Sequence, residues 1–354
     1  MEIVVSNNTN ESDIEKEIND NIKDNLSSFM KSTAKNLTSF IPYGDKIVQL
    51  YSDFNKYSDN NEMQRLLRFF YGINHEDNPN MLIALGPEYA EMLMNFVMKD
   101  MENDKIDYYA NFIISISGKD YSVSDKKNYL YILNKMTLSS IQLMRYYYIS
   151  KMYDLSGYKN RESFENAIVK KVAGFFSMNY SILMNYGLIE QPTTFYSGSV
   201  VNESLIQLSE LIFDKSTLTP EYINEKEKDR YDVVIIKSTY SGCYYPEILV
   251  DQLSNKGVSV CVVDESQFEK HEIFSSVYVS TRESNKKEIG KEYIDLVIEG
   301  EGKLRSVPMD LKDENIHSIN KDYMSRAGFS PICKIRLTES LNEISKKIIT
   351  MLDE

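Results

Sequence analysis

The spacing of apolar and polar positions changes character near residue 214. Before it, apolar residues recur every three or four positions, which is the period of helices packed on a core. After a polar start at 1–12, which we expect to be disordered, this spacing predicts an all-α region over residues 13–120. Its expected helices cover 13–39, 47–57, 63–70, 81–101 and 106–116.

Residues 125–214 combine helical spacing with a hairpin pattern. A helix ending near Gly187 is followed by a polar, turn-rich stretch and a short apolar strand, which leads into Leu205–Phe213. This order resembles a winged helix. It also resembles the winged-helix-like halves of bacterial abortive-infection proteins of the Abi-alpha type. Many winged helices bind DNA, but the acidic net charge favours a role in sensing or oligomerisation.

Residues 215–230 are polar and charged, and we interpret them as a linker between domains. Beyond them, residues 233–236 form a β-branched run without polar alternation, which is typical of a strand buried on both faces of a parallel sheet. Strands are predicted at 231–238, 258–264, 276–280, 306–311 and 332–337, with helices at 246–253, 286–298 and 338–352. Residues 231–354 therefore predict a flavodoxin-like α/β domain, and the whole chain an α+β multidomain protein.

Ligands of open parallel sheets lie at the carboxyl ends of the strands. Polar residues follow the first two predicted strands at these ends: Ser238, Thr239, Tyr240, Gly242 and Asp264. Hydroxyls and the glycine backbone can contact a phosphate or ribose, and a tyrosine ring can stack on a base. Purely structural roles remain open for these residues, because Gly242 also suits a simple turn and tyrosines commonly pack in cores.

The C-terminal region resembles a TIR domain. Residues 231–236 look like its opening strand, 248–257 like its first helix and 258–264 like its second strand. The resemblance implies cleavage of NAD, as a substrate, at the nicotinamide glycosidic bond. It also implies a catalytic glutamate on the helix after the third strand, where Glu292 fits best and Glu288 lies one turn earlier.

This pair of glutamates has two interpretations. Bond cleavage develops oxocarbenium-like charge, which a carboxylate beside the ribose stabilises. The same glutamates with Lys287 and Lys291 equally match a solvated helix face. The sequence also departs from the family pattern after Ser280, where the expected aromatic and cysteine before the glutamate are missing.

The composition and net charge disfavour several classes of binding partner. The net charge of −13 disfavours broad contact with phosphate backbones, so we expect no nucleic-acid partner. Without an 18-residue apolar run or a signal peptide, we expect a cytoplasmic protein and no membrane partner. Widely spaced histidines and cysteines predict no metal site.

We therefore expect a bacterial anti-phage or stress effector. Its helical region would sense a trigger, such as a protein, or form a homo-oligomer, and its TIR-like domain would degrade NAD or a related nucleotide. Three alternatives remain open: a non-catalytic TIR-like interaction module, a nucleoside deoxyribosyltransferase-like N-glycosidase, and a winged-helix DNA-binding regulator. The interaction module tolerates substitution of both glutamates, and product analysis distinguishes the N-glycosidase. Salt-sensitive binding to duplex DNA would favour the regulator.

Overall fold

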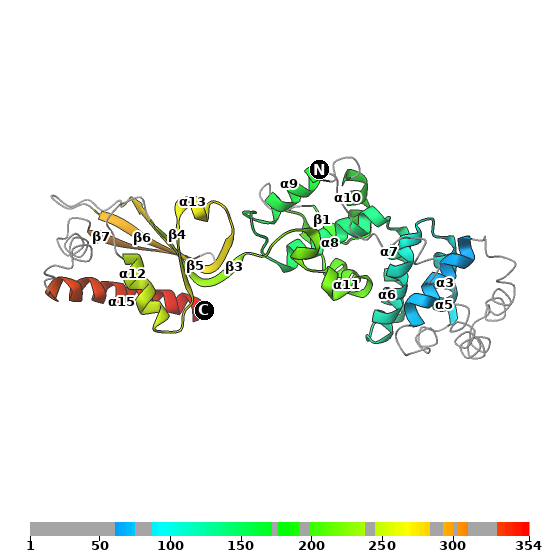
Figure 1. The fold of residues 1–354 in the computed structure, drawn as a ribbon, viewed down its shortest axis with the longest axis horizontal. Coiled ribbons are helices and arrows are strands. Elements are labelled where there is room, and N and C mark those ends of the chain that lie inside the picture. Colours follow the sequence, from blue (N-terminus) through cyan, green and yellow to red (C-terminus); the bar gives the residue numbers. More distant parts are fainter. Residues whose placement is uncertain are drawn as a thin grey trace, which may run out of the picture. The chain divides into compact units, whose positions relative to one another are not determined.

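The computed structural model describes residues 61–74, 87–171, 176–191, 198–237, 245–283, 293–300, 303–310 and 331–353. The chain divides into two compact units (Figure 1). The first unit combines Met1–Lys151 with Ala167–Ile223, and the second combines Met152–Asn166 with Asn224–Glu354. The predicted disordered start and the predicted helices over 13–39 and 47–57 lie outside the described residues.

Helices dominate the N-terminal part of the described chain, as the spacing predicts. In order they are α3 (Asn61–Asn74), α5 (Pro87–Lys99), η2 (Asn103–Lys105), α6 (Ile106–Ser117), α7 (Val123–Lys135), α8 (Leu138–Met152), α9 (Arg161–Lys171), α10 (Phe176–Asn185) and α11 (Glu203–Ile212). Between α10 and α11, β1 (Ile189–Glu190) and β2 (Val200–Val201) pair antiparallel. The expected helices over 63–70 and 106–116 are confirmed.

Helix α6 lies at the centre of the packing in the first unit. It contacts α3, α5, α7 and α11, and buries apolar side chains around its axis, including Tyr109, Phe112 and Ile113. On α3, a Cβ atom added at Gly72 would lie 2.9 Å from the Cβ of Ala110. Since such a contact is too short for two carbon atoms, the close approach of α3 and α6 requires glycine at position 72.

A five-stranded sheet forms the centre of the second unit. Its strands are β3 (Asp229–Lys237), β4 (Val260–Asp264), β5 (Ile273–Glu283), β6 (Tyr293–Gly300) and β7 (Lys303–Asp310), in the spatial order β4-β3-β5-β6-β7. Strand β3 pairs parallel with β4 and β5, whereas β6 pairs antiparallel with β5 and β7. The sheet is therefore mixed, and the expectation of an all-parallel sheet is wrong for β6.

Two predicted elements are wrong. A helix is predicted over 286–298, but 293–300 form β6. The segment YIDLVIEG alternates apolar and polar residues, and a two-residue Glu-Gly connection separates it from β7, which is a hairpin pattern. The strand predicted over 332–337 belongs instead to α15 (Pro331–Asp353), which begins at a proline that favours the first helical turn.

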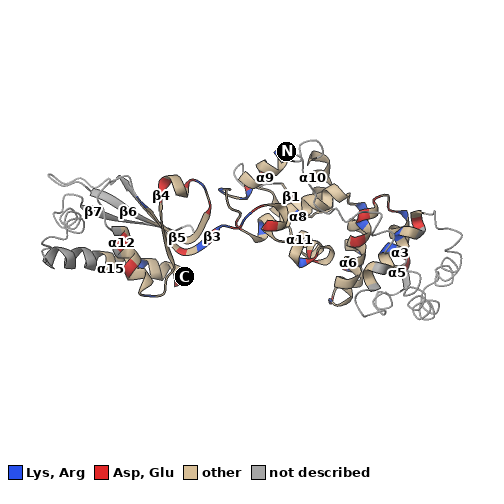
Figure 2. Cartoon of the chain, in the orientation of Figure 1, with Lys and Arg blue, Asp and Glu red and all other residues tan. Residues whose placement is uncertain are grey.

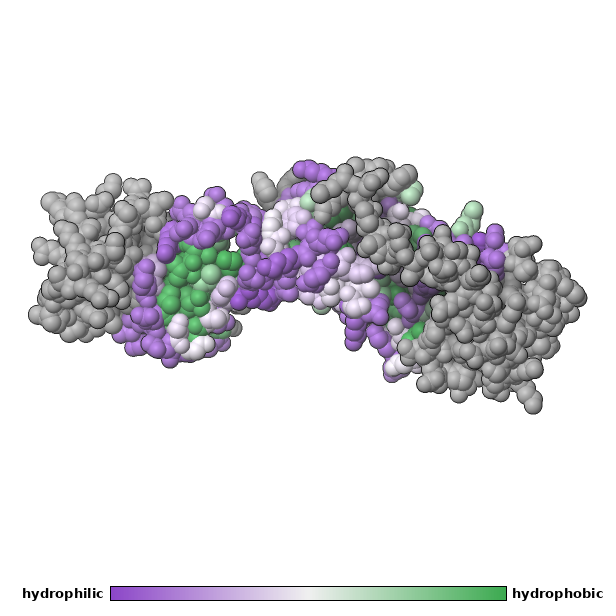
Figure 3. Space-filling view, viewed as in Figure 1, coloured by the Kyte–Doolittle hydropathy of each residue, from purple (hydrophilic) through white to green (hydrophobic). Residues whose placement is uncertain are grey.

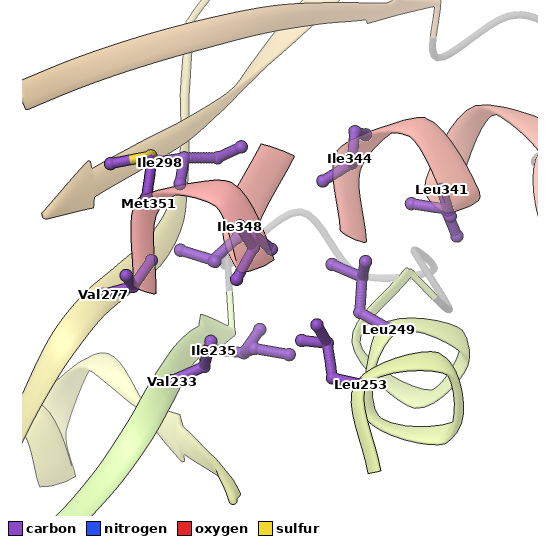
Figure 4. Packing of buried hydrophobic residues seen from close by; sticks show 11 residues of the cluster. Val233, Ile235, Leu249, Leu253, Val277, Ile298, Leu341, Ile344, Ile348 and Met351 are labelled. Carbon is purple, nitrogen blue, oxygen red and sulfur yellow. The ribbon is translucent and has the colours of Figure 1, made fainter. Parts of the chain in front are cut away.

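The core of the second unit lies between the sheet and two helices. Helix α12 (Tyr245–Ser254) and α15 contact each other and pack on the same face (Figure 4). The cluster consists of Val233, Ile235, Leu249, Leu253, Val277, Val279, Ile298, Leu341, Ile344, Ile348 and Met351. Because strand residues alternate between faces, the Tyr278 ring lies on the other face, where it contacts Phe268 of the short α13 (Glu265–Phe268).

Residues 215–230, predicted as a linker, are ordered. They contain η3 (Lys215–Thr217) and η4 (Pro220–Ile223), and β3 begins inside the predicted range. The Lys228 amide donates to the carbonyl of Asp154, and the Ser156 amide donates to the carbonyl of Lys226, each over 2.7 Å. Residues 152–166, predicted to be part of the winged-helix-like segment, therefore belong to the second unit.

Candidate functional site

The carboxyl ends of the parallel strands define the candidate site. Strands β3 and β4 end together, since Lys237 and Asp264 are register partners, and β5 continues to Glu283. Strand β6 starts at the same edge, because Glu283 pairs with Ile294. Strands β4 and β5 lie on opposite sides of β3, so this edge is the topological switch point where ligands bind in open α/β sheets.

The predicted site residues belong to the connections that leave this edge. Ser238, Thr239, Tyr240 and Gly242 fall between β3 and α12, and Glu288 and Glu292 fall between β5 and β6; all six lie outside the described residues. The helix expected to carry the two glutamates does not continue into residue 293, where β6 begins. Glu292 thus directly precedes a strand.

Asp264 is the one predicted site residue that the structure describes. It is exposed and caps α13, where its side chain accepts a hydrogen bond from the backbone of Gln267. The Gln267 side chain in turn accepts from the Asp264 amide at 3.1 Å, completing a capping box. Asp264 therefore has a structural role, which fixes the path of the chain as it leaves β4.

Charged side chains also gather near the start of β3. The Arg230 guanidinium lies 2.9 Å from a carboxylate oxygen of Asp154 and 3.2 Å from one of Glu227, and it covers the Phe274 ring at 5.2 Å. Its charge is balanced by these partners, and they tie residues 152–166 to the sheet. Nearby, burial and the charges of Lys228 and Lys159 lower the pKa of His271, which has a positive φ of 55°. We assign no ligand to this cluster.

The first unit holds a buried cation that the sequence pattern did not indicate. Arg145 of α8 is 3% exposed, and its guanidinium lies between the rings of Phe213 and Tyr222, at 4.1 Å and 4.2 Å from their centroids. Its Nε has no hydrogen-bond partner among the described residues. Arg145 stands in an aromatic run, LMRYYY, where nothing marks one cation as buried. The stacking holds η4 against α8.

The helix and hairpin of the first unit carry little positive charge. Helix α10, with the sequence FSMNYSILMN, contains no lysine or arginine (Figure 2). The segment from Ile189 to Val201 also has none in its sequence. Recognition of duplex DNA relies on cationic side chains that contact phosphates. This part of the chain therefore offers no phosphate-binding surface of that kind.

The described ranges contain neither a metal-binding cluster nor a membrane-spanning helix. Among these residues, no three His, Cys, Asp or Glu side chains lie close enough together to hold a metal ion. No helix within the same ranges has the length and apolar character needed to cross a membrane.

Comparison with protein-family models, with curated proteins and with solved structures gave no match. A function therefore has to be inferred from the residues of this chain.

Proposed function

We propose that the second unit cleaves NAD, or a related nucleotide, at its nicotinamide glycosidic bond. One observation carries the proposal. The connections that contain Ser238 to Gly242 and Glu288 to Glu292 start at the carboxyl edge of β3 and β5, and β4 ends there at Asp264. Three adjacent parallel strands thus end at one edge, which is where ligands of open α/β sheets bind.

The chemistry assigns a role to each group. Ser238, Thr239 and the backbone at Gly242 contact phosphate or ribose, and the Tyr240 ring stacks on a base. Glu292, with Glu288 as the second candidate, holds the ribose hydroxyls or stabilises the positive charge that develops as nicotinamide leaves. NAD is the substrate in this proposal.

The first unit regulates this activity in our proposal, in an anti-phage or stress effector. The order α10, β1, β2 and α11 supports a winged-helix-like arrangement. Because α10 lacks lysine and arginine, a protein trigger or a second copy of the chain suits this surface better than DNA. Trigger recognition by the first unit would then be coupled to NAD cleavage by the second.

Release of nicotinamide by the purified protein tests the proposal. The assay uses high protein concentration with a crowding agent, and compares wild type with Glu292→Ala, Glu288→Ala and the double variant. We expect at least one single variant to lose about a hundredfold or more in rate, as when a transition-state charge partner is removed. Glu272→Ala is the matched control, since this exposed glutamate directly precedes β5, at the other end of the strand.

Each outcome has a defined meaning. Activity that survives in the double variant refutes the assignment of the glutamates, and release of a free base from nucleosides but not from NAD identifies the N-glycosidase alternative. A non-catalytic interaction module is the second candidate function. It is favoured by the position of β4 at the end of the sheet, where its outer side pairs with no described strand, and it predicts no turnover by wild type.

A further inference from the structure

Strand β4 forms one edge of the sheet in the second unit. It pairs with β3 on one side, and no described strand pairs with its other side. The pairing with β3 determines which backbone groups of β4 and the residue before it already form hydrogen bonds, since the Ser259 carbonyl accepts from the Val233 amide. Backbone direction alternates along a strand, so the N–H and C=O groups of Val260 and Val262 point away from β3.

These four backbone groups have no hydrogen-bond partner among the described residues. The amides on either side are occupied, because the Val258 amide donates to the Leu253 carbonyl and the Asp264 amide to Gln267. An edge strand with free backbone groups is a template for a further strand.

The side chains of this edge are apolar except for the exposed Ser259. Val258, Val260, Cys261 and Val262 are each half-buried, and residues 257–263 contain neither charge nor proline. Figure 3 shows an apolar area, bordered by hydrophilic residues, on the unit that contains the sheet. Protected edges usually carry lysine, proline or a bulge, and β4 lacks the first two. Such an edge suits a partner strand of equally apolar character.

We infer that β4 pairs antiparallel with β4 of a second copy of this chain, around a two-fold axis at Cys261. This register places Val260 opposite Val262 of the partner subunit, and the reverse. All four outward backbone groups then form hydrogen bonds, and valines meet valines across the interface. The two sheets join into one continuous sheet through an isologous contact.

The charges at the two ends of the edge select the antiparallel direction. Lys256 lies just before β4, and Asp264 and Glu265 lie at its end; all three are exposed. Antiparallel pairing brings the cationic end of each copy beside the acidic end of the other. Parallel pairing would bring like charges together, which is unfavourable. The second copy of this chain is therefore complementary to the edge in both shape and charge.

Cys261 provides a direct test. In the inferred register it faces its own counterpart at a non-hydrogen-bonded position, where Cα atoms lie about 4.5 Å apart, within the range that a disulfide spans. With Cys243→Ser and Cys333→Ser, Cys261 is the sole thiol of the chain. Oxidation by copper phenanthroline, with oxygen as the electron acceptor, should give a covalent dimer. A chain that stays uncrosslinked while sedimenting as a dimer contradicts the register.

Sedimentation at several concentrations measures the association itself. One chain has a mass of 41.1 kDa, and we expect wild type to approach twice this value. Val262→Lys should weaken the dimer by about tenfold or more, because it places two lysines at the centre of the edge. Thr350→Lys, at an exposed position of α15, is the control with the same charge change.

Charge reversal tests the direction of pairing. Lys256→Glu and Glu265→Lys should each weaken the dimer by about two- to fivefold, as expected for exposed ion pairs, and the double variant should recover wild-type affinity. A wild-type protein that remains monomeric at high concentration overturns the inference, as does a dimer that Val262→Lys leaves intact. These measurements need no NAD turnover, so their outcome is independent of the proposed activity.

Discussion

The two units bury different kinds of side chain. The first encloses charged groups, since Asp100, Lys105 and Arg145 are 8%, 2% and 3% exposed. The core cluster on the sheet of the second unit consists of aliphatic side chains and Met351, and the buried polar side chains described in this unit are the hydroxyls of Ser275 and Ser345. The stability of the first core therefore depends on the geometry of the hydrogen bonds to its buried charges. The stability of the second depends on how completely its side chains fill the available volume.

Lys105 shows what the charged core requires. Its ammonium lies 2.9 Å from a carboxylate oxygen of Asp100 and donates to the carbonyl of Asn134 over 2.8 Å. Tyr109 donates to the same carboxylate oxygen over 2.7 Å. Burial lowers the pKa of Lys105 and raises that of Tyr109, which keeps the phenol protonated as a donor. A buried charge is tolerated where such partners satisfy it, so the network fixes how η2, α6 and α7 meet.

The largest expected effect is the loss of the Lys105 charge. Lys105→Met keeps a side chain of similar length but leaves the Asp100 carboxylate buried without its cation, which should cost about 3–5 kcal/mol. Hydrogen exchange of amides in the first unit, measured at increasing urea concentrations, gives the free energy of unfolding of this unit and so measures the loss. Asp100→Asn in the Lys105→Met background should recover part of it, because no charge then remains buried in this network. A cost below about 1 kcal/mol for Lys105→Met alone contradicts a charge-dependent core.

The aliphatic core should respond to volume instead. Leu253 of α12 is fully buried in the cluster of Figure 4, so Leu253→Ala should cost about 2–4 kcal/mol by leaving a cavity. Leu253→Met keeps the volume and should cost less than about 1.5 kcal/mol. Hydrogen exchange of β3 and β5 measures both. Equal costs for the two variants would mean that shape, and not volume, limits this core.

The sequence predicted elements well where periodicity was unambiguous. The strand predicted at 231–238, which contains the buried β-branched run, corresponds to β3 with a start two residues earlier, and the α12 and β4 predictions are confirmed. The predictions for β6 and for the start of α15 are wrong: the alternation of YIDLVIEG indicates a strand, and Pro331 suits a first helical turn. Strand direction was indicated only for β3, whose run without polar alternation is typical of a parallel sheet and which pairs parallel with β4 and β5. The antiparallel direction of β6 had no such signal, since a strand has the same period in parallel and antiparallel pairs.

The sequence indicated where in the fold the candidate site lies, but not which contacts its residues make. Strand ends followed by polar residues identified the edge at Lys237 and Asp264. The capping role of Asp264 had a sequence signal, an acidic residue three positions before Gln267, which also fits the capping pattern. The burial of Lys105 and Arg145 had none, because each has partners at distant positions, Asn134 for Lys105 and Phe213 for Arg145, beside the nearby Asp100 of Lys105.

The smallest expected effect compares two arginines, one in each unit. Arg145→Lys keeps the charge but loses the planar group that stacks between two rings, and should cost about 2 kcal/mol because the contact is desolvated. Arg230→Lys makes the same change where the side chain is 57% exposed, and should cost about 0.5 kcal/mol. Hydrogen exchange around η4 and around β3 reports each loss separately. If both substitutions cost the same, burial adds nothing to the arginine of the first unit, and the contrast between the two cores reduces to the Lys105 network alone.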